Sequence, residues 1–423
     1  MLKIYQLLTV LLTPVIKIYL FKRKLKGKED SGRFKERLGY ASLPRSVGKL
    51  AWIHAASVGE SISILPLIEQ LSTKFPKLNF LVTTGTVTSA KLMATRLPDC
   101  AIHQYIPVDI LTAVQRFLKH WQPDIAIFAE SEIWPNIITQ TGKTCPLIMV
   151  NGHISEQSFR NWSRDANFAR EIFSAYSLCL TQSETDAGYI KKLGAANVKF
   201  AGNIKYSAAP LSVDEKELAD LKEMIGSRHL WVAASTHFEG ESEELLVASV
   251  HKELKEKHPG LLTIIIPRHP SRKDEILSEL SKMQLKIAVR SHGDKITGDT
   301  DIYLGDTMGE LGMFYHLSDI AFVGGSLVKR GGHNPLEPAR LGCAIIVGPH
   351  SFNFTEINNE FIKKNAIITV TNASELTQTI DNLLKDNKKM ASYINAAYEV
   401  VNDNNGIVEK VIGEISPYIK MPS

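Results

Sequence analysis

The chain repeats one pattern along most of its length: a short run of apolar residues, an amphipathic stretch of helical period, and then another short apolar run. Continuous apolar runs are typical of strands buried on both faces, because a strand with one wet face alternates apolar and polar side chains. Strands separated by helices pair in parallel, since each helix carries the chain back to the same edge of the sheet. The pattern therefore predicts an α/β fold with parallel sheets covered by helices.

The pattern occurs twice along the chain. Its first half predicts strands at 50–55, 79–84, 124–129, 147–151, 178–181 and 198–201. A stretch rich in Ser, Ala and Pro at 207–215 has no periodicity and is typical of a linker. The second half predicts strands at 230–234, 262–267, 286–288, 302–304, 320–323, 344–347 and 366–370, followed by an amphipathic stretch at 374–419. Because 423 residues are too many for one ordinary core, we expect two α/β units. A ligand site is expected in the cleft between them, at the carboxyl ends of the strands.

The first 28 residues differ from the rest of the chain. An apolar run at 4–16 contains Pro14 and ends at Lys17, and residues 18–21 resume it briefly. A bilayer-spanning helix needs about 20 apolar residues, so the run is borderline for a span. Five basic residues follow within seven positions: Lys22, Arg23, Lys24, Lys26 and Lys28. This combination predicts an anchor whose basic flank lies on an anionic, cytoplasmic leaflet. The alternative is an amphipathic helix packed on the protein's own core.

Several function classes find no support in the sequence. The net charge of +4 and the pI of about 8.6 are too weak a bias to predict nucleic-acid binding. The four cysteines form no CxxC pair, and we expect them to be buried small residues in a reducing compartment. The histidines form no HxH or HExxH arrangement, so we predict neither a metal site nor a cofactor. A P-loop ATPase and a nicotinamide dehydrogenase are disfavoured because Walker A and GxGxxG motifs are absent.

Charged residues follow the predicted strands of the first half. Glu60 opens a helix after the first strand, where its carboxylate suits a general base or, equally, complements the helix dipole. The segment 130–135 joins two acids, a tryptophan and a helix-starting proline, and is either part of a site or a solvated loop with a helix cap. Lys205 follows the last strand, where a cation could meet an anionic ligand, although a surface lysine is the commoner case.

The second half has its own polar strand ends. Arg268 and His269 lie between two prolines, and a rigidly placed arginine suits a phosphate or a carboxylate. Residues 305–311, which include Met308, Gly309 and Glu310, start a helix whose backbone N–H groups can receive an anion. Small and hydroxyl residues at 233–237 let a ligand approach the backbone. Ordinary turn and cap chemistry is the alternative for each of these segments.

The glycine-rich segment 324–338 is the most informative of these strand ends. Two glycine pairs precede Asn334 and Pro335, and Pro335 suits the first turn of a helix. Glu337 would lie within that turn, placed to accept hydrogen bonds from a ribose. The arrangement favours a nucleotide phosphate, with a plain glycine-rich turn as the alternative.

In combination, these motifs resemble the 3-deoxy-D-manno-octulosonic acid (Kdo) transferases of Gram-negative lipopolysaccharide synthesis. The resemblance covers essentially the whole chain. It is carried by residues 52–60, 130–135, 202–206, 234–237, 267–270, 305–311, 324–338, 348–350 and 353–354. The chain departs from the family's pattern at Phe238, Ser207 and His153. These positions concern loop details and remove no proposed catalytic group.

The resemblance implies a GT-B fold, with two Rossmann-like lobes whose parallel sheets face a central cleft, and a membrane-anchoring N-terminal helix. The implied segments are an anchor or interfacial helix at 1–28, an acceptor lobe at 29–206, a linker at 207–215 and a CMP-sugar lobe at 216–423, with the last helix able to cross back. The implied activity is metal-independent, inverting transfer of Kdo from CMP-Kdo to a lipid A precursor, at the cytoplasmic face of the bacterial inner membrane.

The resemblance also assigns roles to residues. Glu60 matches the catalytic base, and Glu130 and Lys205 match residues that assist the transition state. The positions that hold CMP are matched by Arg268, His269, Met308, Gly309, Glu310, Asn334, Pro335, Leu336 and Glu337. Two alternatives stay open at this point: a related GT-B enzyme with a UDP-sugar donor, and a nucleotide-sugar binding protein without catalysis.

Overall fold

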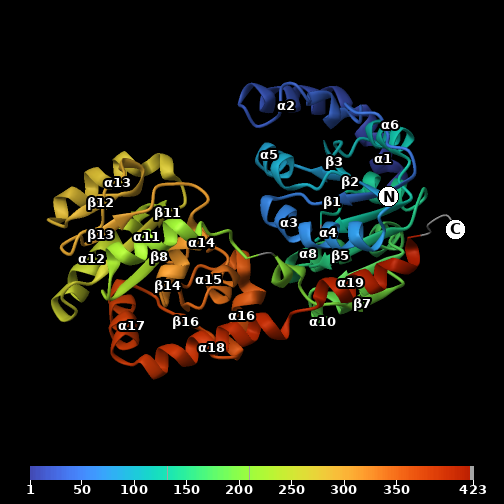
Figure 1. Ribbon diagram of the computed structural model, residues 1–423. Coiled ribbons are helices and arrows are strands. Elements are labelled where there is room, and N and C mark those ends of the chain that lie inside the picture. The colour runs from blue at the N-terminus through green and yellow to red at the C-terminus, as the bar shows by residue number, and fades with distance from the viewer. Residues whose placement is uncertain (131, 209, 420–423) are drawn as a thin grey trace. The chain divides into compact units, whose positions relative to one another are not determined.

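The computed structural model describes residues 1–130, 132–208 and 210–419. Residues 131, 209 and 420–423 lie outside the described residues; they belong to the 130–135 segment, the predicted linker and the end of the predicted second lobe. The described chain divides into two compact units. Unit 1 contains residues 1–208 and the C-terminal residues from 404, and unit 2 contains the residues between them. Each unit is built around one parallel sheet with helices on its faces (Figure 1).

Unit 1 begins with two helices, α1 (Leu2–Leu11) and α2 (Thr13–Leu25), which meet at a bend of 62°. Within the described residues, no single helix is long and apolar enough to cross a bilayer. Helices α1 and α2 have the required length and apolar composition only when they are taken together as a bent pair. The Tyr5 hydroxyl donates to Asp109 at 2.8 Å, and Asp109 also accepts the N–H groups of Asn136 and Ile137. These bonds fasten α1 to the body of unit 1.

The sheet of unit 1 has seven parallel strands in the order β3-β2-β1-β4-β5-β6-β7. They are β1 (Lys49–His54), β2 (Leu78–Thr84), β3 (Ala101–Tyr105), β4 (Ile125–Ala129), β5 (Leu147–Gly152), β6 (Leu178–Thr181) and β7 (Val198–Phe200). The sequence pattern does not predict β3, because His103 and Gln104 interrupt its apolar run at the edge of the sheet. The strand order reverses between β1 and β4, which is where α/β sheets form ligand crevices.

Helices cover both faces of this sheet. They are α3 (Val58–Ser63), α4 (Leu65–Lys74), α5 (Val87–Arg96), α6 (Leu111–Trp121), α7 (Pro135–Thr141), α8 (Glu156–Ser163), α9 (Ala166–Phe173) and α10 (Glu184–Lys192). The pattern at 61–75 predicts one helix, but the structure has two, α3 and α4, because Pro66 starts a new helix after Ile64. Short 3₁₀ turns lie at η1 (Phe34–Leu38) and η2 (Ile204–Ser207).

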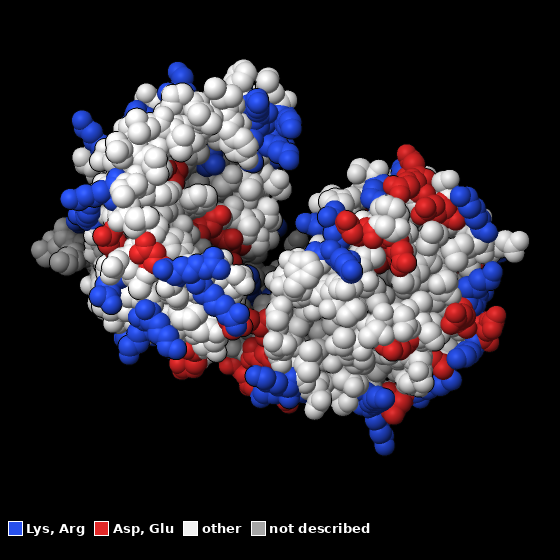
Figure 2. Space-filling model, turned by 180° about the vertical axis from the view of Figure 1, so that it is seen from behind, with Lys and Arg blue, Asp and Glu red and all other residues white. Residues whose placement is uncertain are grey.

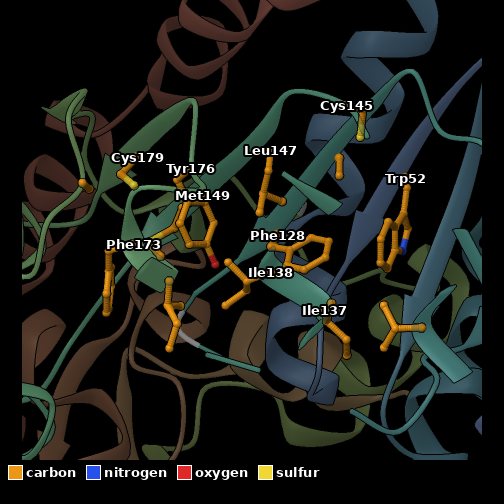
Figure 3. Close-up of a cluster of buried hydrophobic side chains, with 14 of the residues drawn as sticks. Trp52, Phe128, Ile137, Ile138, Cys145, Leu147, Met149, Phe173, Tyr176 and Cys179 are labelled. Carbon is orange, nitrogen blue, oxygen red and sulfur yellow. The ribbon is translucent and has the colours of Figure 1, made fainter. Parts of the chain in front are cut away.

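One apolar cluster fixes the central strands of unit 1 against their helices (Figure 3). Trp52 of β1 packs edge-on against Phe128 of β4, with ring centroids 4.8 Å apart, and against Phe117 of α6 at 4.6 Å. The Trp52 indole N–H donates to Thr83 Oγ1 at 2.9 Å, so its polar atom is satisfied inside the core. This packing holds the carboxyl ends of β1 and β4 in a fixed relation, and both strands lead into predicted site residues.

Unit 2 contains a second seven-stranded parallel sheet, in the order β12-β13-β11-β8-β14-β15-β16. Its strands are β8 (Leu230–Thr236), β11 (Leu262–Pro267), β12 (Ile287–Val289), β13 (Ile302–Leu304), β14 (Ile320–Val323), β15 (Ala344–Val347) and β16 (Ile367–Thr369). A two-stranded hairpin of β9 (Phe238–Glu239) and β10 (Glu241–Ser242) follows β8. The strand order reverses between β8 and β14, so this sheet also has one central switch point.

The helices of unit 2 connect these strands in sequence. They are α11 (Glu215–Ile225), α12 (Glu243–Lys257), α13 (Lys273–Leu280), α14 (Leu311–Leu317), α15 (Leu336–Arg340), α16 (Thr355–Lys363), α17 (Ala373–Lys385) and α18 (Asn387–Asp403). The 3₁₀ turns are η3 (Pro270–Arg272), η4 (Ser281–Met283), η5 (Arg290–His292) and η6 (Phe352–Phe354). Two buried apolar clusters, one on each face of the sheet, form the core of this unit.

The chain returns to unit 1 at its end. Helix α19 (Ile407–Ile415) and the turn η7 (Ser416–Tyr418) belong to unit 1, and α19 packs against α4 and η2. Glu409 accepts a hydrogen bond from Gln70 at 2.6 Å, and Glu414 pairs with Lys199 at the same distance. Gly202 has a φ of +105°, and a Cβ there would lie 2.8 Å from the side chain of Ile407. The close approach of α19 therefore requires glycine at this position.

Candidate active site

Glu60 lies in the first turn of α3, directly after β1. Its Oε2 accepts the N–H of Ala56 at 2.8 Å, and its Oε1 accepts the hydroxyl of Ser57 at the same distance. Ser57 is also the N-cap of α3 and accepts the N–H of Glu60 at 3.3 Å. The side chain is thus held in one orientation and is only 8% exposed. Glu60 thus supports the cap that Ser57 forms and at the same time keeps its carboxylate at the carboxyl end of the sheet.

The environment of Glu60 favours its protonated form. Burial raises the pKa of the Glu60 carboxyl above its ordinary value, and the negative charge of Glu130 raises it further. The hydrogen bonds from Ala56 and Ser57 and the charge of His54 act in the opposite direction and are weaker. A carboxylate with a raised pKa is a stronger base, which suits the removal of a proton from a hydroxyl near neutral pH.

Glu130 follows β4, on the other side of the switch point from Glu60. Its φ of +55° is unusual for a residue with a side chain, and such strain is often found at functional sites. Lys205, in η2, places its Nζ 2.7 Å from Glu130 Oε1. The turn η2 also contacts α3, the helix that carries Glu60. The structure therefore brings Glu60, Glu130 and Lys205 together at one end of the unit 1 sheet.

Asn151 organises this group, although the sequence analysis does not single it out. It lies in β5 and has a φ of +55°. Its amide Nδ2 donates to Glu130 Oε1 at 3.4 Å, and its Oδ1 accepts the N–H of Ile204 at 3.0 Å. It thereby connects Glu130 to the turn that carries Lys205. An Asn-Gly pair at a strand end is an ordinary turn signal, so the sequence offers little to distinguish this role.

His54 and Glu132 lie beside the same strand ends. His54 is buried, and its Nδ1 lies 3.0 Å from both the carbonyl oxygen and the hydroxyl of Thr83. Its Nε2 lies 3.6 Å from Glu132 Oε2, which accepts the indole N–H of Trp134 at 2.9 Å. Burial opposes ionisation of Glu132, but its contact with His54 and its hydrogen bond from Trp134 outweigh burial and lower its pKa. Glu132 is therefore an ionised neighbour of the Glu60 group.

In unit 2, Arg268 and His269 follow β11, and both side chains are exposed. Within the residues that the structure describes, the Arg268 guanidinium has no hydrogen-bond or ion-pair partner, while its backbone N–H donates to the Thr236 carbonyl at 3.0 Å. An arginine held by its backbone with a free guanidinium can bind an anion without first breaking another contact. The ring of His269 lies edge-on to His237, with centroids 5.3 Å apart.

His237 and His333 form a hydrogen-bonded pair beside Arg268. Their Nε2 atoms are 3.1 Å apart, and their rings lie parallel. Burial and then the neighbouring cationic groups, which include Arg268 for both, lower the pKa of His237 to about 4 and that of His333 to about 3. Both rings are therefore neutral near pH 7, and one must donate to the other. A negative ligand beside Arg268 would oppose these shifts.

Met308, Gly309 and Glu310 precede α14. Met308 is 74% exposed, and Gly309 has a φ of +88°. Glu310 receives hydrogen bonds from Arg290 at 2.7 Å and from Thr307; these bonds overcome the effect of burial and lower its pKa. A hollow of about 320 Å³ opens here, lined by Ser212, Val213, Asp214, Gly309, Glu310 and Met313. Its size is within the range of small-ligand sites.

Residues Asn334 to Glu337 form a compact turn at the start of α15. Asn334 Oδ1 accepts the N–H of Leu336 at 3.1 Å, and its Nδ2 donates to Glu337 Oε1 at 3.3 Å. Pro335 is the N-cap of α15, and Glu337 lies in its first turn. Burial raises the pKa of Glu337 above its ordinary value. A protonated carboxyl there can donate as well as accept a hydrogen bond.

The first glycine pair of the segment 324–338 differs from the sequence expectation. The backbone N–H groups of this turn, at residues 325–328, are expected from the sequence to receive a phosphate. In the structure they donate instead to the carboxylate of Glu243. Glu243 Oε2 accepts the N–H of Gly325 at 2.6 Å, and Oε1 accepts that of Leu327 at 3.0 Å. Sequence spacing gives no sign of this contact, since the partners are more than 80 residues apart. The N–H groups of residues 325–328 are therefore already occupied by Glu243.

Comparison with known proteins agrees with this arrangement. The sequence model described as "3-Deoxy-D-manno-octulosonic-acid transferase (kdotransferase)" matches residues 32–208, and that of "Glycosyl transferases group 1" matches residues 246–400. The 3-deoxy-D-manno-octulosonic acid transferase of Rickettsia bellii is 36% identical over 99% of this chain and 100% of its own length. The enzyme of that name from Haemophilus influenzae is 34% identical over 98% of each chain.

The fold is also found in solved structures. The UDP-GlcNAc 2-epimerase of Neisseria meningitidis matches with a TM-score of 0.59 at 13% identity, over 86% of this chain and 100% of that one. At this identity the likeness concerns the fold alone, which is the α/β GT-B fold. The match to curated relatives over their full length carries the more specific conclusion: the chain belongs to the Kdo transferase family of glycosyltransferases.

Proposed function

We propose that this Kdo transferase takes Kdo from CMP-Kdo and adds it, with inversion, to a lipid A precursor, and that Glu60 is the general base. The observation that carries the proposal is the environment of the Glu60 carboxylate. Its carboxylate is buried, fixed by Ala56 and Ser57, and has a raised pKa beside the Glu130–Lys205 ion pair. If the carboxylate of Glu60 only supported the cap of α3, it would need neither the neighbouring carboxylate of Glu130 nor a raised pKa.

The proposed reaction is a single displacement. Glu60 takes the proton of an acceptor hydroxyl while that oxygen bonds to the anomeric carbon of Kdo. The bond from this carbon to the CMP phosphate breaks, and CMP leaves with the electron pair. Lys205 balances the charge of Glu130, so that two carboxylates can remain close to each other while Glu60 acts as base. General-base catalysis of this kind contributes about 10²–10⁴-fold to a rate.

The donor is assigned to unit 2. Arg268 supplies a guanidinium for the single phosphate of CMP, beside His269. The hollow at Gly309 and Glu310 offers space for a small ligand portion, with the exposed Met308 next to it. The turn formed by Asn334, Pro335, Leu336 and Glu337 offers amide and carboxyl groups for the ribose hydroxyls. These contacts support a nucleotide with one phosphate and one ribose.

The decisive measurement is a transfer assay with CMP-Kdo and a lipid A precursor, followed by mass spectrometry of the product, which also counts the Kdo residues added. CMP should inhibit competitively against CMP-Kdo, while UDP at the same concentration should inhibit weakly. Equal inhibition by UDP would contradict the assignment of the donor. Binding of CMP-Kdo without transfer to any lipid acceptor would instead support a binding protein.

The first two helices of unit 1 are proposed to bind the membrane that contains the lipid acceptor. Most apolar side chains of α1 and α2 are exposed, among them Leu7, Leu11, Val15 and Phe21. Lys and Arg side chains gather at the edge of unit 1 where α2 ends (Figure 2). Exposed apolar surface next to basic residues supports binding to an anionic lipid surface, at the cytoplasmic face of the bacterial inner membrane. The alternative, that these helices pack on the protein's own core, is disfavoured by their exposure.

Vesicle binding tests this assignment. Replacing Lys24, Lys26 and Lys28 with alanine should weaken binding to vesicles with 30% anionic lipid by roughly 1 kcal/mol per lysine. Replacing Lys191, Lys192 and Lys222, which lie elsewhere on the surface, is the matched control and should change binding little. Equal binding by all three proteins would contradict a membrane role for this edge.

A further inference from the structure

We propose that Glu243 is a positioning residue for the donor nucleotide, because its carboxylate holds together the two loops that carry His237 and His333. The inference rests on the proposed function, since it names how unit 2 shapes the CMP site. Glu243 is the first residue of α12, and its side chain is completely buried. It belongs to none of the motifs that the sequence analysis assigns to the site.

The carboxylate of Glu243 accepts five backbone hydrogen bonds. Oε2 binds the N–H groups of His237 at 2.9 Å and Gly325 at 2.6 Å, and Oε1 binds those of Ser326 at 3.1 Å, Leu327 at 3.0 Å and Val328 at 3.4 Å. His237 follows β8 and the other four residues follow β14. These two strands flank the switch point of the unit 2 sheet, so one side chain joins the loops on its two sides.

The four N–H groups after β14 form a concave site of the kind that binds anions. Gly325 has the left-handed φ of +66° that such a turn requires. A phosphate could bind in this geometry, but the carboxylate of Glu243 already fills it. The phosphate of the donor is therefore assigned to groups outside this turn, such as Arg268 after β11, and Glu243 itself satisfies the N–H groups of the turn.

Gly325 links this turn to the proposed donor contacts in two ways. Its carbonyl oxygen accepts the N–H of Gly332 at 2.8 Å, which fixes the chain immediately before His333 and Asn334. A Cβ at Gly325 would lie 3.2 Å from the rings of both His237 and His333, so the histidine pair packs directly on this glycine. Any shift of the turn would therefore displace the histidine pair, which lies beside the guanidinium of Arg268.

The test compares purified full-length wild-type protein with the variant Glu243→Gln. The amide keeps the size of the side chain but turns one acceptor into a donor, which would face at least two backbone N–H groups. We expect the dissociation constant of CMP and the KM for CMP-Kdo to rise about tenfold or more, the size expected when buried N–H groups lose their acceptor. The kcat at saturating donor should change less than threefold, because Glu60 belongs to unit 1.

A matched control separates positioning from stability. Asp381 of α17 is another buried carboxylate of unit 2, and it binds His258 at 2.7 Å and Lys385 at 2.9 Å. Asp381→Asn should lower the melting temperature without raising the KM for CMP-Kdo. In Glu243→Gln, spectra of ¹⁵N-labelled histidine should also lose the signals of the hydrogen-bonded His237–His333 pair, which a general loss of stability would not remove selectively.

A second variant keeps the proposal testable if Glu243→Gln does not fold. Gly325→Ala leaves Glu243 in place but pushes against both histidine rings, and it should raise the KM for CMP-Kdo in the same way. Unchanged CMP binding in Glu243→Gln, or a KM rise of equal size in Asp381→Asn, would overturn the inference. If wild-type protein itself fails to bind CMP, the proposed donor is wrong, and the result is distinguishable from a failure of the role of Glu243.

Discussion

The two units share a topology but carry opposite chemistry at the same place. Each has seven parallel strands and one switch point, between β1 and β4 in unit 1 and between β8 and β14 in unit 2. In unit 1 the carboxylates of Glu60 and Glu130 follow the two switch-point strands. In unit 2 the corresponding strands lead to His237 and to the loop before His333, and Arg268 follows the neighbouring strand β11.

This difference shows that the topology of the sheet determines where a site forms, whereas the side chains at the strand ends determine its chemistry. The crevice at a switch point exists because neighbouring strands send their connections to opposite faces of the sheet. In unit 1 it holds a buried carboxylate with a raised pKa, which suits proton removal. In unit 2 the two strands lead to neutral imidazoles, with the guanidinium of Arg268 after the neighbouring strand β11, and these groups suit an anionic ligand.

The largest expected effect is on kcat, and it comes from a substitution in unit 1 alone. Glu60→Gln should lower kcat about 10²–10⁴-fold, because the amide cannot take the proton of the acceptor. CMP binding, measured by calorimetry, should stay within threefold of wild type, since the change lies in unit 1. The amide oxygen can still accept the N–H of Ala56, so the melting temperature should change by only a few degrees. Near-normal turnover would remove Glu60 from the mechanism.

For Arg268→Ala, in unit 2, we expect the KM for CMP-Kdo to change more than kcat. Losing a charged hydrogen bond to the CMP phosphate costs about 1.5–3 kcal/mol, so the KM for CMP-Kdo should rise roughly 10- to 150-fold while kcat changes less. Lys286→Ala removes another positive charge from unit 2, from an exposed pair with Asp299, and serves as control. If both variants had the same modest effect, Arg268 would be acting only through the overall charge of the unit.

The smallest effect concerns the acidic limb of the kcat–pH profile. The base must be ionised, so kcat falls as the pH drops through the raised pKa of Glu60. Glu130→Gln removes a negative charge that raises this pKa, so the limb should move to lower pH. Glu69→Gln, an exposed change on α4, should leave it in place. A shift to higher pH would show that Glu130 lowers the pKa of Glu60.

Sequence pattern predicts the fold well where strands are apolar throughout. Both central strands of each sheet are found where expected, because burial on both faces permits few polar residues. Edge strands follow this rule less strictly, and β3 is missed because His103 and Gln104 interrupt it. The break between α3 and α4 is also missed, because the apolar period continues across residues 62–68 and hides the helix start that Pro66 marks.

The candidate site is less visible in the sequence. Glu60, Glu130 and Lys205 stand out as charges at strand ends, but spacing alone cannot tell a helix cap from a base. In the structure Ser57 is the N-cap, and burial and the charge of Glu130 raise the pKa of Glu60. Asn151 and Glu243 act through contacts between distant segments. Glu243 meets Gly325 across 82 residues, and no local pattern records such a pairing.

The return of the chain to unit 1 has a consequence for how the protein is made. Residues 1–208 leave the ribosome first, but α19, which packs on α4 and η2, follows only after all of unit 2. At about 5–20 residues per second, roughly 10–40 s separate the two parts of unit 1. Unit 2 can thus complete its fold during translation, whereas unit 1 waits for α19. Synthesis order alone delays the completion of unit 1 until α19 has been made.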